Sequence, residues 1–313
     1  MFLASDQPVP SMTNDALLES QSLMGDETVD TTREDLCILD SHVHFCDLAR
    51  PEGVVWPEAN SSLFRTMLPS DWLAAMQPRN AYGCIAVETS RRPEDDEWLL
   101  ALAQREPLVR GVVLNLQPDN PGFSERLGPI CQAEAFVGIR LRPIVHYDLA
   151  ADTLRDSLAL LHELQKTIEF GARDSTHKRQ FAELASAYPN TTWILDHCGH
   201  PTAPARNDTD WKRAMADIAA RSNTVVKISG LAGEIDTWRA TFDYLLELFG
   251  PTRLLYGSNW PVSTLHEAEE DRIGTFARWL GNDRHAFLVG NAARVYGVAP
   301  SDAGASPHAK QPL

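Results

Sequence analysis

The sequence lacks the cysteine patterns of disulfide scaffolds and of thiolate zinc sites. Its five cysteines are an odd number, and no two of them form a Cys-x-x-Cys pair. Small secreted domains that depend on disulfides carry even, regularly spaced cysteines. The cysteine usage therefore excludes a disulfide framework and favours a reducing compartment, so we expect a cytoplasmic protein.

Long apolar runs are also missing. A membrane-spanning helix needs about 20 consecutive apolar residues, and no run in this chain approaches that length. The first residues do not place a basic region before an apolar stretch, as a secretory signal would. We therefore expect no membrane partner and no export.

Positive charge is scarce, because 28 Lys and Arg face 43 Asp and Glu and give a net charge of −15. A negative surface repels nucleic-acid phosphates, so nucleic-acid partners are excluded. The acids concentrate in residues 1–34, a polar stretch without periodicity that we expect to be a disordered or loosely docked leader. Residues 300–313 are expected to form a flexible tail.

Between these ends, short β-branched or apolar runs alternate with helical patterns, which is typical of βα units and a parallel sheet. The expected strands are 36–40, 83–88, 109–114, 137–141, 167–170, 192–196, 224–228 and 254–257. The expected helices are 69–77, 95–105, 123–133, 154–164, 177–187, 211–221, 237–248 and 266–280. Eight units predict an α/β fold, a single-domain (β/α)₈ TIM-type barrel over residues 35–299.

A doubly wound open sheet usually has a glycine-rich phosphate loop after its first strand. Here that place holds His42-Val43-His44-Phe45 instead. Residues two apart on an extended chain face the same side, so His42 and His44 could share a metal ion or a substrate. A chance pair of surface histidines is the alternative, and the position at a strand end argues against it.

Strand six is followed by the run Asp196-His197-Cys198-Gly199-His200. In a closed barrel the chemistry sits at the carboxyl ends of the strands, so His197 is a candidate catalytic or metal-binding residue. A buried structural histidine is the alternative, and His200 could be a loop residue without a role. Asp196 has the opposite parity to His197, and we expect it to face the helices or to orient a neighbour.

Basic side chains stand at the ends of two further strands. Arg140 and Arg142 are two apart on strand four, and a guanidinium needs an anionic or carbonyl partner when it is buried. A substrate carboxylate is one such partner, and a structural ion pair with an acid such as Glu88 or Glu169 is the other. On strand seven, Lys227 could likewise bind a carboxylate or pair with an acid.

Strand eight ends in Gly-Ser-Asn-Trp-Pro-Val, residues 257–262. Asn259 can donate and accept hydrogen bonds but cannot abstract a proton as a carboxylate does. Trp260, with Trp56 and Phe45, could form apolar walls around a substrate, although each could equally be part of the barrel packing.

Together these motifs resemble the amidohydrolase-related family, in particular its lactonase branch. The resemblance rests on His-x-His-Phe, Gly-Ile-Arg, Leu-Asp-His-x-Gly-x-Pro, Lys-x-Ser-Gly-Leu, Gly-Ser-Asn-Trp-Pro-Val and the closing Gly-Asn-Ala-Ala-Arg-Val-Tyr-Gly of residues 290–297. It implies a barrel hydrolase centred on His42, His44 and His197, with Arg140 as a substrate clamp. Many members carry aspartate where this chain has Asn259.

The resemblance implies that a small, carboxylate-bearing lactone is opened by activated water. His42, His44 and His197 are the expected metal ligands if zinc or manganese is bound, and without metal a histidine must act as the base. The expected catalytic residues are these histidines and Asn259, and the expected substrate-binding residues are Arg140, Arg142, Lys227 and Trp260.

Two other functions remain open at this level. The first is a metal-dependent decarboxylase of an unsaturated or aromatic acid, and the second is a barrel that has lost catalysis and only binds. The identity of the lactone and the presence of a homo-oligomer are not determined by the sequence.

Overall fold

The structure is a computed structural model that describes residues 36–77, 79–142, 147–265 and 271–298. The expected leader and tail lie outside these residues, as does the first part of the helix expected over 266–280. Among the described helices, none is both long and apolar enough to cross a membrane.

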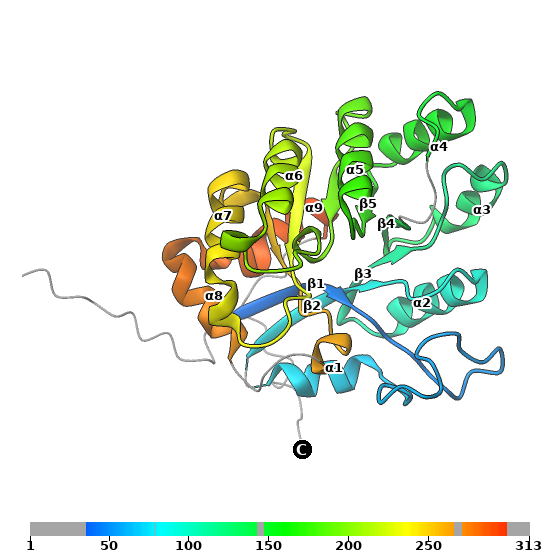
Figure 1. Cartoon of the computed structure of the whole chain (residues 1–313). Coiled ribbons are helices and arrows are strands. Elements are labelled where there is room, and N and C mark those ends of the chain that lie inside the picture. Colours follow the sequence, from blue (N-terminus) through cyan, green and yellow to red (C-terminus); the bar gives the residue numbers. More distant parts are fainter. Residues whose placement is uncertain (1–35, 78, 143–146, 266–270, 299–313) are drawn as a thin grey trace, which may run out of the picture. The chain divides into compact units, whose positions relative to one another are not determined.

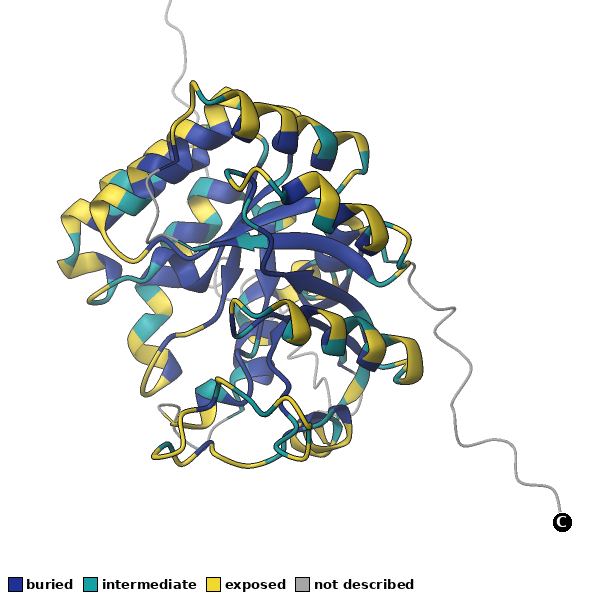
Figure 2. Cartoon of the chain, turned by 90° about the vertical axis from the view of Figure 1, so that its right-hand side faces the viewer, coloured by how far each residue is buried: buried dark blue, intermediate teal, exposed yellow. Residues whose placement is uncertain are grey.

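Eight parallel strands form one sheet, and each strand pairs with the next one along the chain. They are β1 (Cys37–Val43), β2 (Asn80–Val87), β3 (Val109–Leu114), β4 (Phe136–Leu141), β5 (Thr167–Phe170), β6 (Trp193–Leu195), β7 (Thr224–Ile228) and β8 (Leu254–Tyr256). Most of their residues are buried (Figure 2). In such a barrel the helices cover the outer face of the sheet, and side chains of the strands fill the inside. The predicted (β/α)₈ barrel is confirmed.

Helices follow the strands and surround the sheet (Figure 1). They are α1 (Pro69–Met76), α2 (Pro93–Arg105), α3 (Phe123–Ile130), α4 (Asp152–Glu163), α5 (Ser175–Ala187), α6 (Thr209–Ala219), α7 (Arg239–Phe249), α8 (Arg272–Leu280) and α9 (Asn291–Tyr296). Helix α9, which lies in the closing motif, was not predicted.

Two helices begin earlier than predicted because an aspartate caps each of them. The Asp174 carboxylate accepts a hydrogen bond from the backbone N–H of His177, so α5 begins at Ser175. The Asp208 carboxylate accepts one from the N–H of Trp211, so α6 begins at Thr209. An N-cap side chain bonds two or three residues into its helix, and the apolar periodicity therefore starts after the true end.

The barrel closes where the end of β1 meets the segment after β8. The backbone N–H of Asn259 donates to the carbonyl of His42 at 2.9 Å, and that of His44 donates to the carbonyl of Trp260 at 2.8 Å. Strand β1 consequently runs to Val43, three residues further than predicted. The hydrogen bonds that close the barrel therefore also fix the backbone of His42 and His44.

One glycine of the strand-four motif is explained by strand spacing. A Cβ on Gly138 would lie 2.3 Å from Oγ1 and 2.6 Å from the carbonyl oxygen of Thr167 on β5. The backbone oxygen cannot move away without breaking the ladder, so only glycine fits. This close contact fixes β4 against β5 and places Arg140 opposite Glu169 in the register.

Candidate active site

The two histidines of β1 form a hydrogen-bonded pair inside the barrel. His42 is fully buried and His44 is 5% exposed, and their Nε2 atoms lie 3.2 Å apart. His44 Nδ1 lies 2.9 Å from the carbonyl oxygen of Val87. A carbonyl can only accept, so Nδ1 of His44 carries the proton and its Nε2 is the acceptor in the neutral ring.

The tautomer of His42 follows from the same argument. Its Nε2 must donate to His44, so its Nδ1 must accept, and the Lys227 ammonium lies 3.1 Å from that atom. The Lys227 ammonium thus donates to His42, His42 donates to His44, and His44 donates to the carbonyl of Val87. In this arrangement both β1 imidazoles use both ring nitrogens.

His197 enters the site through a strained turn. Strand β6 ends at Leu195, and His197 and Cys198 adopt positive φ angles of 52° and 55°. Left-handed backbone at residues other than glycine is costly and gathers at functional sites. The turn brings His197 beside His42, with ring centroids 4.6 Å apart.

Only one ring nitrogen of His197 is engaged. Its Nδ1 lies 2.8 Å from Oγ of Ser229 after β7, whereas no hydrogen bond from the described residues reaches its Nε2. A Cβ on Gly230 would lie 3.0 Å from Cβ of His197, which explains the glycine in Lys-x-Ser-Gly. His197, at 8% exposed, is therefore the imidazole of this centre with a nitrogen available to a substrate or a water molecule.

Of the two alternatives expected for Asp196, facing the helices was wrong, whereas contact with neighbouring site residues is what the structure has. Asp196 shares the parity of Ile194, which is paired with Glu169 on β5, so its carboxylate points into the barrel. It lies 2.8 Å from Nε of Arg140 and 3.6 Å from Nζ of Lys227. The turn at His197 breaks the strand alternation, which is why both neighbours reach the site.

Buried charges in the site are balanced. Three carboxylates and three cations take part, namely Glu88, Glu169 and Asp196 with Arg140, Arg142 and Lys227. Burial by itself would raise the pKa of Asp196, but the guanidinium and ammonium groups hold it well below its usual range. Buried charges are tolerated only when they are paired in this way.

Arg140 at the end of β4 and Arg142 just after it make ion pairs and remain partly exposed. Arg142 pairs with Glu88, and Arg140 lies 3.9 Å from Glu88 as well as in contact with Asp196. Their side chains are 18% and 29% exposed for Arg140 and Arg142, respectively. Each guanidinium has five N–H donors, so an ion pair leaves some of them available to a substrate anion.

Lys227 has a different environment, because its side chain is fully buried. Its ammonium lies 2.7 Å from Glu169, whose other oxygen accepts a 2.5 Å hydrogen bond from the hydroxyl of Tyr296 on α9. Burial raises the pKa of Glu169, and the Lys227 ammonium opposes that rise. The same ammonium therefore contacts both Glu169 and Nδ1 of His42.

Asn259 lies at the rim of the same centre. It is 8% exposed and has a φ of 57°, a left-handed conformation that asparagine tolerates better than most residues. Its backbone is fixed by His42 and Ser263, while none of the hydrogen bonds among the described residues engages its side-chain amide. The amide is therefore available to a substrate or to water.

Aromatic side chains flank the histidines. The ring of Trp56 lies 5.6 Å from that of His44, and Trp260 packs against Phe45 at 6.1 Å. Trp56 is the aromatic side chain that contacts a site histidine, and Trp260 is 4% exposed within the closing segment.

The residues fit a divalent metal. Among the described residues, His42, Asp196 and His197 form the group whose ligand atoms lie within 4.8 Å of one another. One oxygen of Asp196, Oδ1, is buried without a hydrogen bond. His44 approaches this group through His42, and two nitrogens on one tetrahedral zinc would lie about 3.3 Å apart. Imidazole and carboxylate donors suit zinc or manganese.

Burial keeps the site histidines neutral. It lowers the pKa of His42 and His197 well below their usual value, and that of His44 to about 4, with Arg140 adding to the effect on His44. A neutral histidine is the active form of a base, so we expect kcat/KM to stay level from pH 7 down to about pH 5.5. A pH profile with a midpoint near 6.5 would contradict this expectation.

The lowered pKa values of the site histidines also make the free energy of unfolding depend on pH. Below about pH 6.5 the unfolded chain binds protons on these histidines, whereas the folded protein binds them only at lower pH, near pH 4 in the case of His44. Their contribution to the free energy of unfolding therefore decreases as the pH falls through this window. Urea unfolding at pH 7.5 and pH 5 measures it.

Two residues of the site were not identified as functional candidates from the sequence. Glu169 was considered only as an ion-pair partner, and Tyr296 was seen only as part of the closing motif. An acidic residue within an otherwise apolar strand indicates a buried carboxylate, and Glu169 in Thr-Ile-Glu-Phe fits that pattern. No comparable signal marks Tyr296.

The chain is similar to known proteins. The model of a family described as amidohydrolase matches residues 39–298. An L-fucono-1,5-lactonase of Burkholderia ambifaria is 26% identical over 286 residues, which cover 83% of this chain and 92% of the relative. A 4-sulfomuconolactone hydrolase of Rhizobium radiobacter is 31% identical over 122 residues, or 34% of this chain and 40% of the relative.

Solved structures show the same fold. The crystal structure of an amidohydrolase from Burkholderia multivorans, with bound zinc, superposes with a TM-score of 0.73 at 24% identity. It covers 84% of this chain, which spans the whole of that structure.

Proposed function

Because the chain belongs to the amidohydrolase family, we propose that it is a hydrolase that opens the ring of a small carboxylate-bearing lactone. Water attacks the ester carbonyl, and the product is a hydroxy acid. The observation that carries the proposal is the open Nε2 of His197 beside the charge-balanced histidine centre. Relatives named as lactonases, similar over most of the chain, support this reaction class.

His197 is the proposed base. Its neutral Nε2 can take a proton from the attacking water, and Ser229 holds the opposite ring nitrogen. When the lactone opens, the protonated His197 can return the proton to the leaving alkoxide. Asp196, ionised and close to His197, stabilises the positive charge that the ring carries between these two steps.

Arg140 and Arg142 are the proposed clamp for the substrate carboxylate. They lie at the carboxyl end of β4 with exposed donors, and their ion pairs with Glu88 and Asp196 fix their directions. Lys227 was expected to share this task; because its side chain is fully buried and its ammonium lies next to Glu169 and His42, we propose that it positions His42 instead. Trp56 and Trp260 are proposed as apolar walls, and the Asn259 amide as a hydrogen-bond partner of substrate or water.

His42, Asp196 and His197, with His44 beside them, would hold a divalent zinc or manganese ion, which would supply water activation and carbonyl polarisation. His197 would then serve as a ligand in place of its role as the base, because Ser229 holds its other ring nitrogen.

The proposed reaction predicts hydrolysis of at least one lactone in a panel that includes sugar-acid lactones and unsaturated lactones with a carboxylate. Product identification should find the hydroxy acid and no carbon dioxide. Carbon dioxide would indicate the decarboxylase instead, and inactivity across lactones, esters and acids would favour a barrel that only binds. Purified protein that is free of metal and fully active after chelation would exclude the metal.

The role of Asn259 can be separated from its backbone strain. Asn259→Gly keeps the left-handed backbone and removes the amide, and we expect kcat/KM to fall about 100-fold, as for loss of one transition-state donor. Asn259→Ala should lose the same activity and, in addition, about 1–2 kcal/mol of stability. Wild-type activity in the glycine variant would remove the amide from the mechanism.

A further inference from the structure

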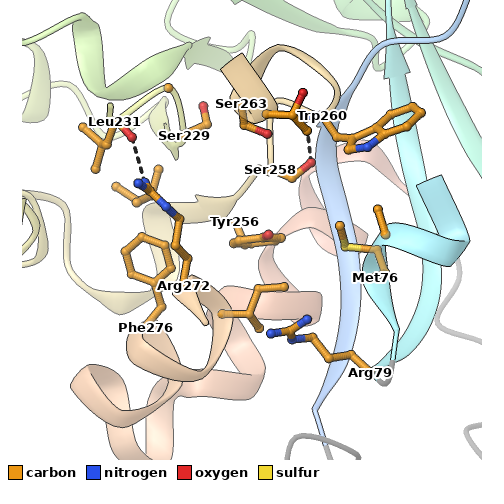
Figure 3. A pocket seen from close by; sticks show the side chains of 16 residues that line it. Met76, Arg79, Ser229, Leu231, Tyr256, Ser258, Trp260, Ser263, Arg272 and Phe276 are labelled. Carbon is orange, nitrogen blue, oxygen red and sulfur yellow. Dashed lines mark hydrogen bonds between the residues drawn. The ribbon is translucent and has the colours of Figure 1, made fainter. Parts of the chain in front are cut away.

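A cavity lies on the outer side of β7 and β8, away from the histidine centre. Its volume is about 640 Å³, and its lining comes from the segments after β7 and β8, from α8 and from the end of α1 (Figure 3). Ile228 and Tyr256 are paired across β7 and β8 and line the cavity, whereas the preceding pair, Lys227 and Leu255, faces the inside of the barrel. Successive strand residues face opposite sides, so the wall of β7 and β8 separates this cavity from the histidines.

The lining combines apolar side chains with two arginines. Met76, Tyr256, Ile273 and Phe276 supply buried apolar surface. The described lining residues include two arginines, Arg79 and Arg272, and no aspartate or glutamate. In a chain of net charge −15, a basic cavity without acids in its wall favours an anion.

The two arginines have different tasks. Arg272 donates to the carbonyls of Leu231 and Gly233 and so ties the segment after β7 to α8. Arg79 uses one terminal nitrogen in an ion pair with Asp271, the residue that caps α8. Figure 3 shows the Arg79 side chain reaching into the cavity from the side of α1, with Tyr256 between it and Arg272.

One donor of Arg79 is left over. The side chain is only 10% exposed, and its Nε is buried without a hydrogen-bond partner among the described residues. A buried guanidinium donor without a partner is unfavourable unless a ligand accepts from it. The hydroxyl groups of Ser258, Ser263 and Thr264 line the same cavity and can add hydrogen bonds to an anion.

The place of the cavity in the barrel also favours an anionic ligand. In (β/α)₈ barrels, the segments after strands seven and eight, together with a nearby helix N-terminus, frequently bind an anionic phosphate group. Here Gly230, Gly257 and the first residues of α8 line the cavity at that place. The apolar surface of Tyr256 and Phe276, however, suits a ligand with a hydrophobic body rather than phosphate alone.

From these observations we infer that the cavity is a second ligand site, distinct from the histidine centre, which binds a small organic carboxylate through Arg79. The carboxylate accepts from Arg79 and the nearby hydroxyls, while the organic body packs on Tyr256 and Phe276. The site does not depend on the proposed lactonase reaction, because none of these residues belongs to the proposed catalytic set.

Benzoate is a suitable probe, with benzamide as an uncharged molecule of the same shape and inorganic phosphate as an anion without an apolar body. Calorimetric titration of the full chain should give saturable binding of one benzoate, with benzamide and phosphate each at least tenfold weaker. Binding of benzamide as tight as that of benzoate, or tighter binding of phosphate, would overturn the assigned chemistry.

Substitutions in the cavity lining test where benzoate binds. Arg79→Gln should weaken benzoate binding at least tenfold, whereas Arg65→Gln, which removes an exposed arginine outside the cavity lining, should leave it unchanged. Ala75→Trp keeps both arginines and fills the cavity from an exposed position of α1, so it should also abolish binding without unfolding the protein. Benzoate binding that persists in Arg79→Gln and is lost in Arg140→Ala would place the ligand in the histidine site and overturn the inference.

Discussion

Replacing His197 with alanine is expected to lower kcat/KM for lactone hydrolysis about 10³- to 10⁴-fold, because a positioned general base contributes about 10²- to 10⁴-fold and both ring nitrogens of His42 and of His44 are already engaged. The loss should fall on kcat, since the clamp formed by Arg140 and Arg142 is unchanged. Steady-state kinetics on the lactone identified by the panel measures it.

The control for this variant is His162→Ala, which removes an exposed histidine of α4 and should retain wild-type kinetics. Thermal unfolding should show that His197→Ala is still folded. If kcat were unchanged while the protein remained folded, the base would have to be another group. If KM alone rose, His197 would be a substrate-binding residue.

Replacing Lys227 with methionine should have the largest effect on stability. The ammonium is the cation in direct contact with Glu169 and also faces Asp196, and all three groups are fully buried. Removing one partner of a buried ion pair costs about 3–5 kcal/mol, because the remaining charge loses its compensation. Urea unfolding at pH 7.5 should show a loss of this size.

The double variant Lys227→Met/Glu169→Gln should recover most of that loss, because glutamine is neutral and can still accept from Tyr296. Lys212→Met, which removes a partly exposed lysine above the ring of Tyr244, should cost less than about 1 kcal/mol.

The pH dependence gives a further check on Lys227→Met. Without the ammonium the pKa of Glu169 in the folded protein rises further above its unfolded value. A raised carboxylate pKa gives stability that is lost as the pH rises, so the penalty relative to wild type should be larger at pH 8 than at pH 5. An equal penalty at both pH values would mean that packing, and not charge, explains the loss.

Most of the fold could be predicted from the sequence, because its signals are local. Apolar and β-branched runs mark the strands whether or not their partners are known, and β3, β5 and β7 match their predicted limits. The errors occurred where a tertiary contact sets the boundary. Strand β1 continues to Val43 because the segment after β8 pairs with it, and that partner is more than 200 residues away.

The sequence by itself determined the barrel, its strand order and the strand ends at which candidate residues stand, because hydrophobic periodicity and chain order are properties of neighbouring residues. The tertiary structure alone decided which charges pair: that Lys227 faces Glu169 and His42, that Asp196 joins Arg140, and that Tyr296 closes the network. Ion pairs, tautomers and buried donors depend on distances between groups from different strands, and those distances exist only after the barrel has closed.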